Sequence, residues 1–259
     1  MLILAGALQD DPARLPVYEA PRAVDGIRID GRLDEVSWAL APRAREFRHI
    51  YDPARPPNYP TAAAIVWDDS NLYVAFDCTD PEPWGRFTQR DDRLWEEEVV
   101  EVFLDPDGDG LHYAELEVSP HNVVVDLLLP RPKSDVVQAL RWNIEGLETA
   151  VGRHASGWTA EIAIPWKSLA AAGVHGPPQA GDRWRTGLYR IKRPGGAAKA
   201  GEIARLELEL KGTAAGQRTA VERRLRALRA DDEFLAWSLT RPERGFHDPE
   251  RFGYLHFLR

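Results

Sequence analysis

The sequence predicts an all-β protein, folded as an antiparallel β-sandwich of the jelly-roll or immunoglobulin type, with one helical insertion. Short runs of alternating apolar residues recur along the chain, turn residues separate most of them, and long helical patterns are confined to one segment. Such a series of short strands is typical of a sandwich rather than of strand–helix–strand units. The length of 259 residues fits one large all-β domain.

The elements are expected in the following order. A Pro-rich lead-in is followed by a short strand at 27–29, a Gly turn and one helical turn that places Trp38 at the edge of the core. Turn residues 68–70 then join two strands as a hairpin. A further single helical turn is expected at 165–169. The predicted longer strands are residues 61–67, 71–78, 97–104, 112–118, 122–129, 140–149, 157–164, 183–191 and 253–258.

Residues 195–232 interrupt this pattern and form the predicted insertion. Apolar residues alternate over 203–210, and Val221, Leu225 and Leu228 have helical spacing within an Arg-rich segment at 219–230. We expect a solvated amphipathic insertion, with a lid or an anion contact as the alternative. The domain organisation is therefore a lead-in at 1–19 and a single domain at 20–259 that carries the insertion.

Composition limits the classes of function. The chain has 33 Lys and Arg against 41 Asp and Glu, for a net charge of −8, so binding to a phosphate backbone is not expected. A hydrophobic content of 44% supports a full core. The single cysteine, Cys78, excludes an intramolecular disulfide and is expected to pack as a small hydrophobic residue.

The first eight residues form an apolar run that ends near small residues but has no basic segment before it. A truncated export signal and a strand-forming or disordered terminus are both compatible with this pattern. Nothing in the sequence is long and apolar enough to predict a transmembrane segment.

The stretch at 93–110 combines an aromatic residue, alternating acids and an acidic turn. In an extended chain alternate side chains share a face, so Trp95 and Glu101 are expected on one face, opposite the apolar residues 100, 102 and 104. A flat ring beside carboxylate acceptors suits a pyranose, whose C–H faces are apolar and whose hydroxyls are donors. The alternative is that Trp95 belongs to the core.

Three acids, Glu101, Glu115 and Glu117, are expected on that same sheet face. Glycoside hydrolases use two carboxyl groups, one of them with a raised pKa. Acids on an open sheet face are expected to stay solvated and ionised, which suits hydrogen bonding rather than proton donation. The sequence therefore favours noncatalytic binding over hydrolysis.

Four further observations are the segments at residues 29–38 (IDGRLDEVSW), 67–76 (WDDSNLYVAF), 94–105 (LWEEEVVEVFLD) and 246–253 (FHDPERFG). Taken in order, these segments resemble the family 9 carbohydrate-binding modules and their DOMON-like relatives. The resemblance extends from about residue 20 to the C-terminus. It implies a β-sandwich that binds a free sugar, or the end of a glucan or xylan chain, between two tryptophans, and that is often fused to glycoside hydrolases. It also implies a role in carbohydrate catabolism, with an extracellular or periplasmic location.

The resemblance assigns the stacking residues and the main carboxylate. Trp95 matches the first stacking tryptophan, and Glu101 matches the hydrogen-bonding carboxylate six positions later. Trp237 lies where relatives often carry the second aromatic residue, and Trp84 is a local alternative.

The resemblance also implies polar contacts below the sugar. Asn122 falls near the polar pair of the family and is expected to share a face with Asp126. Arg190 matches a polar position beneath the ligand, with a structural salt bridge as the alternative. Gly187 stands where family members often carry Asn.

A metal is a further possibility at the acidic turn. Asp105, Asp107 and Asp109 have the alternate spacing that converges oxygens on calcium, but the twelfth position of an EF-hand loop would be Leu116 instead of Glu. A plain turn is the expectation. Structural calcium is the alternative because relatives contain it, and no other cofactor is expected.

Two other functions stay open. DOMON-like relatives imply haem binding and electron transfer, but the only methionine is Met1, which leaves a bis-His site among His112, His121, His154 and His247. The third interpretation is a structural sandwich without a ligand. The sequence does not specify the sugar or the oligomeric state.

Overall fold

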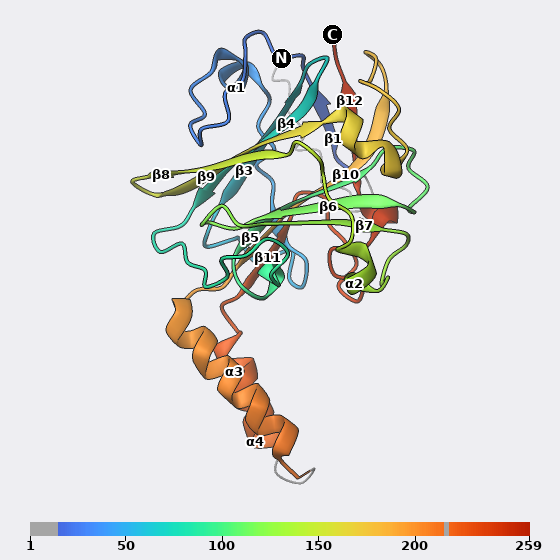
Figure 1. Cartoon of the computed structure of the whole chain (residues 1–259). Coiled ribbons are helices and arrows are strands. Elements are labelled where there is room, and N and C mark those ends of the chain that lie inside the picture. The colour runs from blue at the N-terminus through green and yellow to red at the C-terminus, as the bar shows by residue number, and fades with distance from the viewer. Residues whose placement is uncertain (1–14, 215–217) are drawn as a thin grey trace, which may run out of the picture.

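The computed structural model describes residues 15–214 and 218–259, and it confirms the β-sandwich (Figure 1). In this part of the chain, sheet A has eight strands and sheet B has four. Sheet A contains β1 (Val17–Ala20), β12 (Gly253–Phe257), β10 (Arg183–Lys192), β5 (Val99–Asp105), β6 (Tyr113–Val118) and β7 (Val124–Leu129) in that order, with β11 (Glu233–Ala236) beside β10 and β2 (Arg48–His49) beside β11. Sheet B contains β3 (Thr61–Trp67), β4 (Asn71–Thr79), β9 (Gly157–Pro165) and β8 (Glu148–His154).

The strand pairing is antiparallel except between β1 and β12. The predicted hairpin is confirmed, because β3 pairs with β4 along its full length across the Asp68–Ser70 turn, where Asp68 accepts hydrogen bonds from the Ser70 and Asn71 backbone N–H groups. The side chain of Asp68 thus fixes the turn that sets the register of sheet B.

The main core lies between the two sheets and follows the alternation of the strands. On β5, Val100, Val102 and Leu104 point into this core, whereas Val99 and Phe103 point to the other face of sheet A. Burial of each such side chain contributes about 1.5–3 kcal/mol to stability. Alternation along β5 therefore behaves as the sequence predicts.

The outward face of sheet A is covered as well. A second apolar cluster forms there, over which lie η1 (Leu94–Glu96), α2 (Val136–Ala139) and the segment before η4 (Pro249–Arg251). In this cluster the ring of Tyr189 stacks on that of Phe246, with centroids 4.3 Å apart. This covering is what creates a cavity on an otherwise open sheet face.

Several predicted boundaries are wrong. Residues 140–149 do not form one strand, because Asp135 caps α2 and turns then carry the chain to β8 at Glu148. Residues 27–29 are not a strand, although one helical turn, α1 (Val36–Leu40), follows as expected. Trp38 of α1 is buried and donates its indole N–H to Glu161. The turn predicted at 165–169 is η2 (Trp166–Ala172).

The insertion is a helical hairpin that projects away from both sheets (Figure 1). Its helices are α3 (Gly196–Gly212) and α4 (Arg218–Leu228), and Leu206 packs against Val221 and Leu225. The 203–210 run is therefore helical, because its Ala, Arg, Leu and Glu residues favour a helix and apolar residues at 203, 206 and 210 share one face.

Two predictions concern the ends and the membrane. The apolar run at residues 1–8 lies outside the described residues. Within the described ranges, no helix combines the length and the apolar character needed to span a bilayer.

Candidate functional site

A cavity of about 710 Å³ opens on the outward face of sheet A. Its floor comes from β5 and β6, one side from β7 and α2, and the other side from β10, β11 and the loop at 245–247. Residues from η1 stand at its rim. The cavity exists because α2 and the 245–247 loop rise above the sheet and leave the strands between them uncovered.

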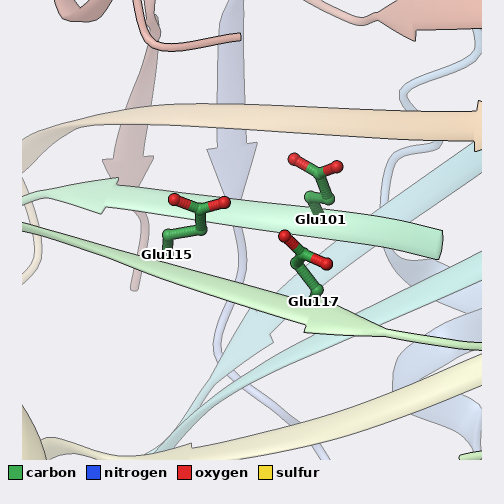
Figure 2. A group of neighbouring side chains, drawn as sticks. All are labelled: Glu101, Glu115 and Glu117. Carbon is green, nitrogen blue, oxygen red and sulfur yellow. The ribbon is translucent and has the colours of Figure 1, made fainter. Parts of the chain in front are cut away.

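Three carboxyl groups form the floor of the cavity. Glu101 on β5 lies directly opposite Glu117 on β6, and Glu115 lies two residues before Glu117 on the same face. Figure 2 shows that the three side chains project to the same side of the sheet with their carboxyl groups turned toward one another. One oxygen from each lies within 4.8 Å of the others, and the residues are only 2%, 4% and 1% exposed for Glu101, Glu115 and Glu117.

Burial changes the proton affinity of these acids. It raises the pKa of Glu101 and of Glu117 well above the ordinary value for a glutamate, and the negative charges of neighbouring acids raise both further. Burial also raises the pKa of Glu115, which His247 lowers in part. The expectation that these acids are solvated is thus wrong, because the walls of the cavity cover the sheet face, and their burial opposes the ionised form.

Aromatic rings stand above these acids. Trp95 lines the cavity from η1, half-buried, and its ring centroid lies 6.0 Å from the guanidinium carbon of Arg93. Tyr51 also lines the cavity and is 61% exposed, with its ring edge-to-face against Phe234 at 5.6 Å. Phe246 completes the set of rings. The arrangement provides apolar rings at the rim and buried carboxyl groups at the floor.

Sequence reasoning missed Tyr51 as a candidate ring. The only signal near it is the Pro-rich segment that follows at 52–60, which predicts a loop but not which surface the loop approaches. The sequence predicts an extended strand at Trp95, whereas this residue lies in the 3₁₀ turn η1. The structure nevertheless brings Trp95 and Glu101 to the same cavity.

Arg190 and Trp237 do not reach the cavity. Arg190 is fully buried on the side of β10 that faces sheet B, where it donates to Asp80 at 2.8 Å and to Thr61 at 3.1 Å. The salt-bridge alternative is therefore the observed one. Trp237 is buried in the core between the sheets, with its ring edge-to-face to Tyr18 at 6.4 Å. Alternation of side chains along the chain places both residues on the face of sheet A that is opposite to the cavity.

Asn122 also lies elsewhere. It is an exposed turn residue with a positive φ of 59°, and its side-chain N–H₂ donates to the Thr149 carbonyl oxygen on sheet B. Asp126 bonds to Arg90 on the inner side of β7, so the expected pair does not face the cavity. The strand begins only at Val124, since the turn before it needs a left-handed residue.

The remaining local candidates have structural roles. Trp84 donates its indole N–H to the Arg193 carbonyl oxygen at 2.6 Å, at the base of the helical hairpin. At Gly187 an added Cβ would lie 2.4 Å from the Tyr189 ring, so only glycine fits beneath that ring. The Tyr189 ring thus occupies the space that a side chain at 187 would take.

The acidic turn satisfies much of its own hydrogen bonding. Asp105 accepts from the backbone N–H groups of Gly108 and Gly110, and Asp109 accepts from that of Leu111. One oxygen from each of Asp105, Asp107 and Asp109 lies within 4.8 Å of the others. The calcium alternative stays a prediction at this turn.

Two of the candidate haem histidines have separate neighbours. The His247 ring contacts the Tyr113 hydroxyl at 3.0 Å at the cavity, and the His154 ring lies 3.3 Å from Asp77 on sheet B. The bis-His alternative therefore gains no geometric support from these two residues.

The protein is a β-sandwich with a cavity on the outward face of sheet A, lined by aromatic rings and by three carboxyl groups. This combination is typical of ligand-binding modules. Residues 29–185, more than half of the chain, match the family described as carbohydrate family 9 binding domain-like. The chain belongs to this family.

Similar proteins agree with that assignment. The chain is 30% identical over 107 residues to the exoglucanase XynX of Acetivibrio thermocellus, and 30% identical over 105 residues to the endo-1,4-beta-xylanase A of Thermoanaerobacterium saccharolyticum. These segments cover 41% and 40% of this chain but only 9% and 8% of the enzymes.

Among solved structures, the fold is similar to that of a family 9 carbohydrate-binding module from Caldicellulosiruptor kristjanssonii in complex with cellotriose. The TM-score is 0.56 at 13% identity, over 93% of both chains. A family 9 carbohydrate-binding module from the same organism in complex with glucose is also similar in fold. The TM-score is 0.55 at 13% identity, over 93% of this chain and 94% of the other.

Proposed function

We propose that this protein binds carbohydrate without catalysis, in the cavity on the outward face of sheet A. The observation that carries the proposal is the placement of Trp95 and Tyr51 at the rim of a cavity whose floor is Glu101, Glu115 and Glu117. A sugar ring has an apolar face for the aromatic rings and hydroxyl groups for the carboxyls. Membership of a carbohydrate-binding family supports the same conclusion.

The carboxyl groups suit hydroxyl recognition in either protonation state. An ionised carboxylate accepts from hydroxyl donors, whereas a protonated one both donates and accepts. Each neutral hydrogen bond contributes about 0.5–1.5 kcal/mol net, and an aromatic contact adds a similar amount. Because ordering costs offset much of this sum, we expect dissociation constants in the micromolar to millimolar range.

The biological setting is part of the proposal. The similarity to short segments of an exoglucanase and a xylanase supports a role in polysaccharide breakdown, in association with glycoside hydrolase activity. An extracellular or periplasmic location fits that role, since polysaccharides are degraded there.

The first test is calorimetric titration with glucose, cellotriose and xylo-oligosaccharides, using the wild type, Trp95→Ala and Asn122→Ala. Trp95→Ala removes a ring at the cavity, so we expect affinity to fall about five- to tenfold, equivalent to ~1 kcal/mol. Asn122→Ala is the matched control, because Asn122 was the sequence-based candidate but lies outside the cavity; its affinity should stay within about twofold of the wild type. Equal affinities of Trp95→Ala and the wild type would overturn the proposed site, and Tyr51→Ala tests the second ring in the same titration.

A further inference from the structure

Among the described residues, each buried acid outside the cavity floor has a cationic side chain or a backbone N–H group as its partner. Asp80 contacts Arg190 and Lys192, Glu97 contacts Arg86, and Asp126 contacts Arg90. The same holds for Glu98 with Lys192, Asp232 with Arg193, Glu233 with Arg55 and Asp248 with Arg241. Two others, Asp105 and Glu161, accept from backbone N–H groups instead. The fold thus supplies a donor to each of these acids.

The exception is the cavity floor. In the described part of the chain, neither an Arg nor a Lys pairs with Glu101, Glu115 or Glu117, and the Oε2 atoms of Glu115 and Glu117 lack a hydrogen-bond partner. The nearest basic group is the His247 ring, whose Nδ1 lies 3.9 Å from Glu115 Oε2 and already contacts Tyr113. Glu115 and Glu117 both line the cavity.

An unpaired buried acid is costly, so its presence calls for a partner. Burying a carboxylate without a cation or donor costs several kcal/mol, and the group responds by holding a proton. Three such acids with oxygens within 4.8 Å of one another repel when ionised. A cation that enters the cavity would relieve both the repulsion and the missing hydrogen bonds.

The geometry selects the kind of cation. A primary ammonium has three N–H donors, which matches three converging acceptor oxygens at hydrogen-bond distance. The rings of Trp95 and Phe246 at the same cavity also attract a cation through their faces. Arg93, Lys133 and Arg193 also line the cavity, so the selection of a cation depends on the floor acids alone.

We propose that the cavity selects glycans whose bound sugar carries a free amino group, and that Glu101, Glu115 and Glu117 hold its ammonium. This inference rests on the proposed sugar site and deepens it by naming the class of sugar. The ring of the hexosamine lies against Trp95, as for a neutral sugar, and the amino group replaces one hydroxyl above the floor. N-acetylation removes the charge and two donors, so it removes the preference.

The test compares glucose, glucosamine and N-acetylglucosamine by calorimetric titration of the wild type at neutral pH and constant ionic strength. We expect glucosamine to bind at least about tenfold more tightly than the other two, equivalent to ~1.4 kcal/mol. Because the ammonium favours ionised carboxylates, its binding should also release protons, detected as a dependence of the heat on the ionisation enthalpy of the buffer. Glucose should release none.

Two variants assign the effect to the floor. Glu117→Gln keeps the shape of the side chain but removes its charge, and should reduce the ratio of glucosamine affinity to glucose affinity by at least about threefold. Asp107→Asn is the matched control, since it makes the same change in net charge at an exposed turn residue outside the cavity and should leave the preference intact.

The outcomes separate the two proposals. Equal binding of glucose and glucosamine would overturn the amino-sugar inference and leave the sugar site standing, whereas no binding of any sugar or oligosaccharide would overturn both. A titration with Ca²⁺ alone tests whether the three glutamates bind a metal ion instead. Saturable Ca²⁺ binding that Glu117→Gln abolishes, without a preference for glucosamine, would assign the carboxylates to a metal and overturn the inference.

Discussion

Sheet A buries charged groups on both of its faces, and the two groups differ in how they are compensated. On the side facing sheet B, Arg190 and Lys192 of β10 both contact Asp80, with N–O distances of 2.8 and 2.7 Å, and Lys192 also contacts Glu98. On the outward side, the three glutamates at the cavity floor have no Lys or Arg partner among the described residues. Both groups are almost completely buried.

The difference separates a structural role from a binding role. Asp80 follows β4 of sheet B, so its contacts with Arg190 and Lys192 fasten the two sheets together. Burial still raises the pKa of Glu98 to about 8, although Lys192 opposes the change. The floor glutamates form no such contact with sheet B, and they line a cavity. Uncompensated burial is therefore a better indicator of a ligand site here than burial alone.

The largest expected effect comes from breaking the compensated group. Arg190→Met leaves Asp80 with one cation instead of two and should lower the free energy of unfolding by about 3–5 kcal/mol, measured by urea denaturation. Arg224→Met is the control, because Arg224 pairs with Glu202 on the exposed surface of the hairpin, and its effect should be below about 1 kcal/mol. Similar losses in both variants would contradict the structural role of the Arg190 contacts.

A medium effect concerns pH. Burial raises the pKa values of Glu101 and Glu117, so between the ordinary glutamate value of ~4.3 and the native values the folded protein binds more protons than the unfolded chain. The free energy of unfolding should therefore fall as pH rises above ~4.3. Glu117→Gln should flatten this fall, so that the variant gains stability relative to the wild type as pH rises.

The measurement is urea denaturation at a series of pH values. Since Glu98 also has a raised pKa, part of the fall should persist in Glu117→Gln, and the change relative to the wild type isolates the floor. A pH profile identical to that of the wild type would show that the charge at position 117 is already compensated.

The smallest effect compares two buried tyrosines. The Tyr18 hydroxyl donates to the Pro42 carbonyl oxygen at 2.6 Å and accepts from the Ile65 N–H at 2.8 Å, whereas the Tyr189 hydroxyl is buried without a hydrogen-bond partner among the described residues. Thermal denaturation should show a loss of about 1–2 kcal/mol for Tyr18→Phe and a change within about 0.5 kcal/mol for Tyr189→Phe. The reverse order would mean that the Tyr189 hydroxyl is hydrogen-bonded in solution.

Part of the candidate site was predictable from local pattern. Strand alternation and the resemblance selected Trp95 and Glu101, and both line the cavity, although their contacts with a sugar stay a prediction. Arg190 illustrates the limit, because it follows Leu188 on the inner face of β10 and only the strand register shows which face that is. Asn122 failed for a different reason, since a left-handed turn holds it before the strand begins.

The sequence by itself determined the sandwich, the hairpin at Asp68 and the face of β5 that carries Glu101, because alternation and turn chemistry act over a few neighbouring residues. Only the tertiary structure decided that α2 and the 245–247 loop enclose that face, which buries three glutamates together and brings Tyr51 to them from a distant part of the chain. Water exclusion depends on which segments cover a surface. It follows from the packing of the whole chain, and no local run of residues encodes it.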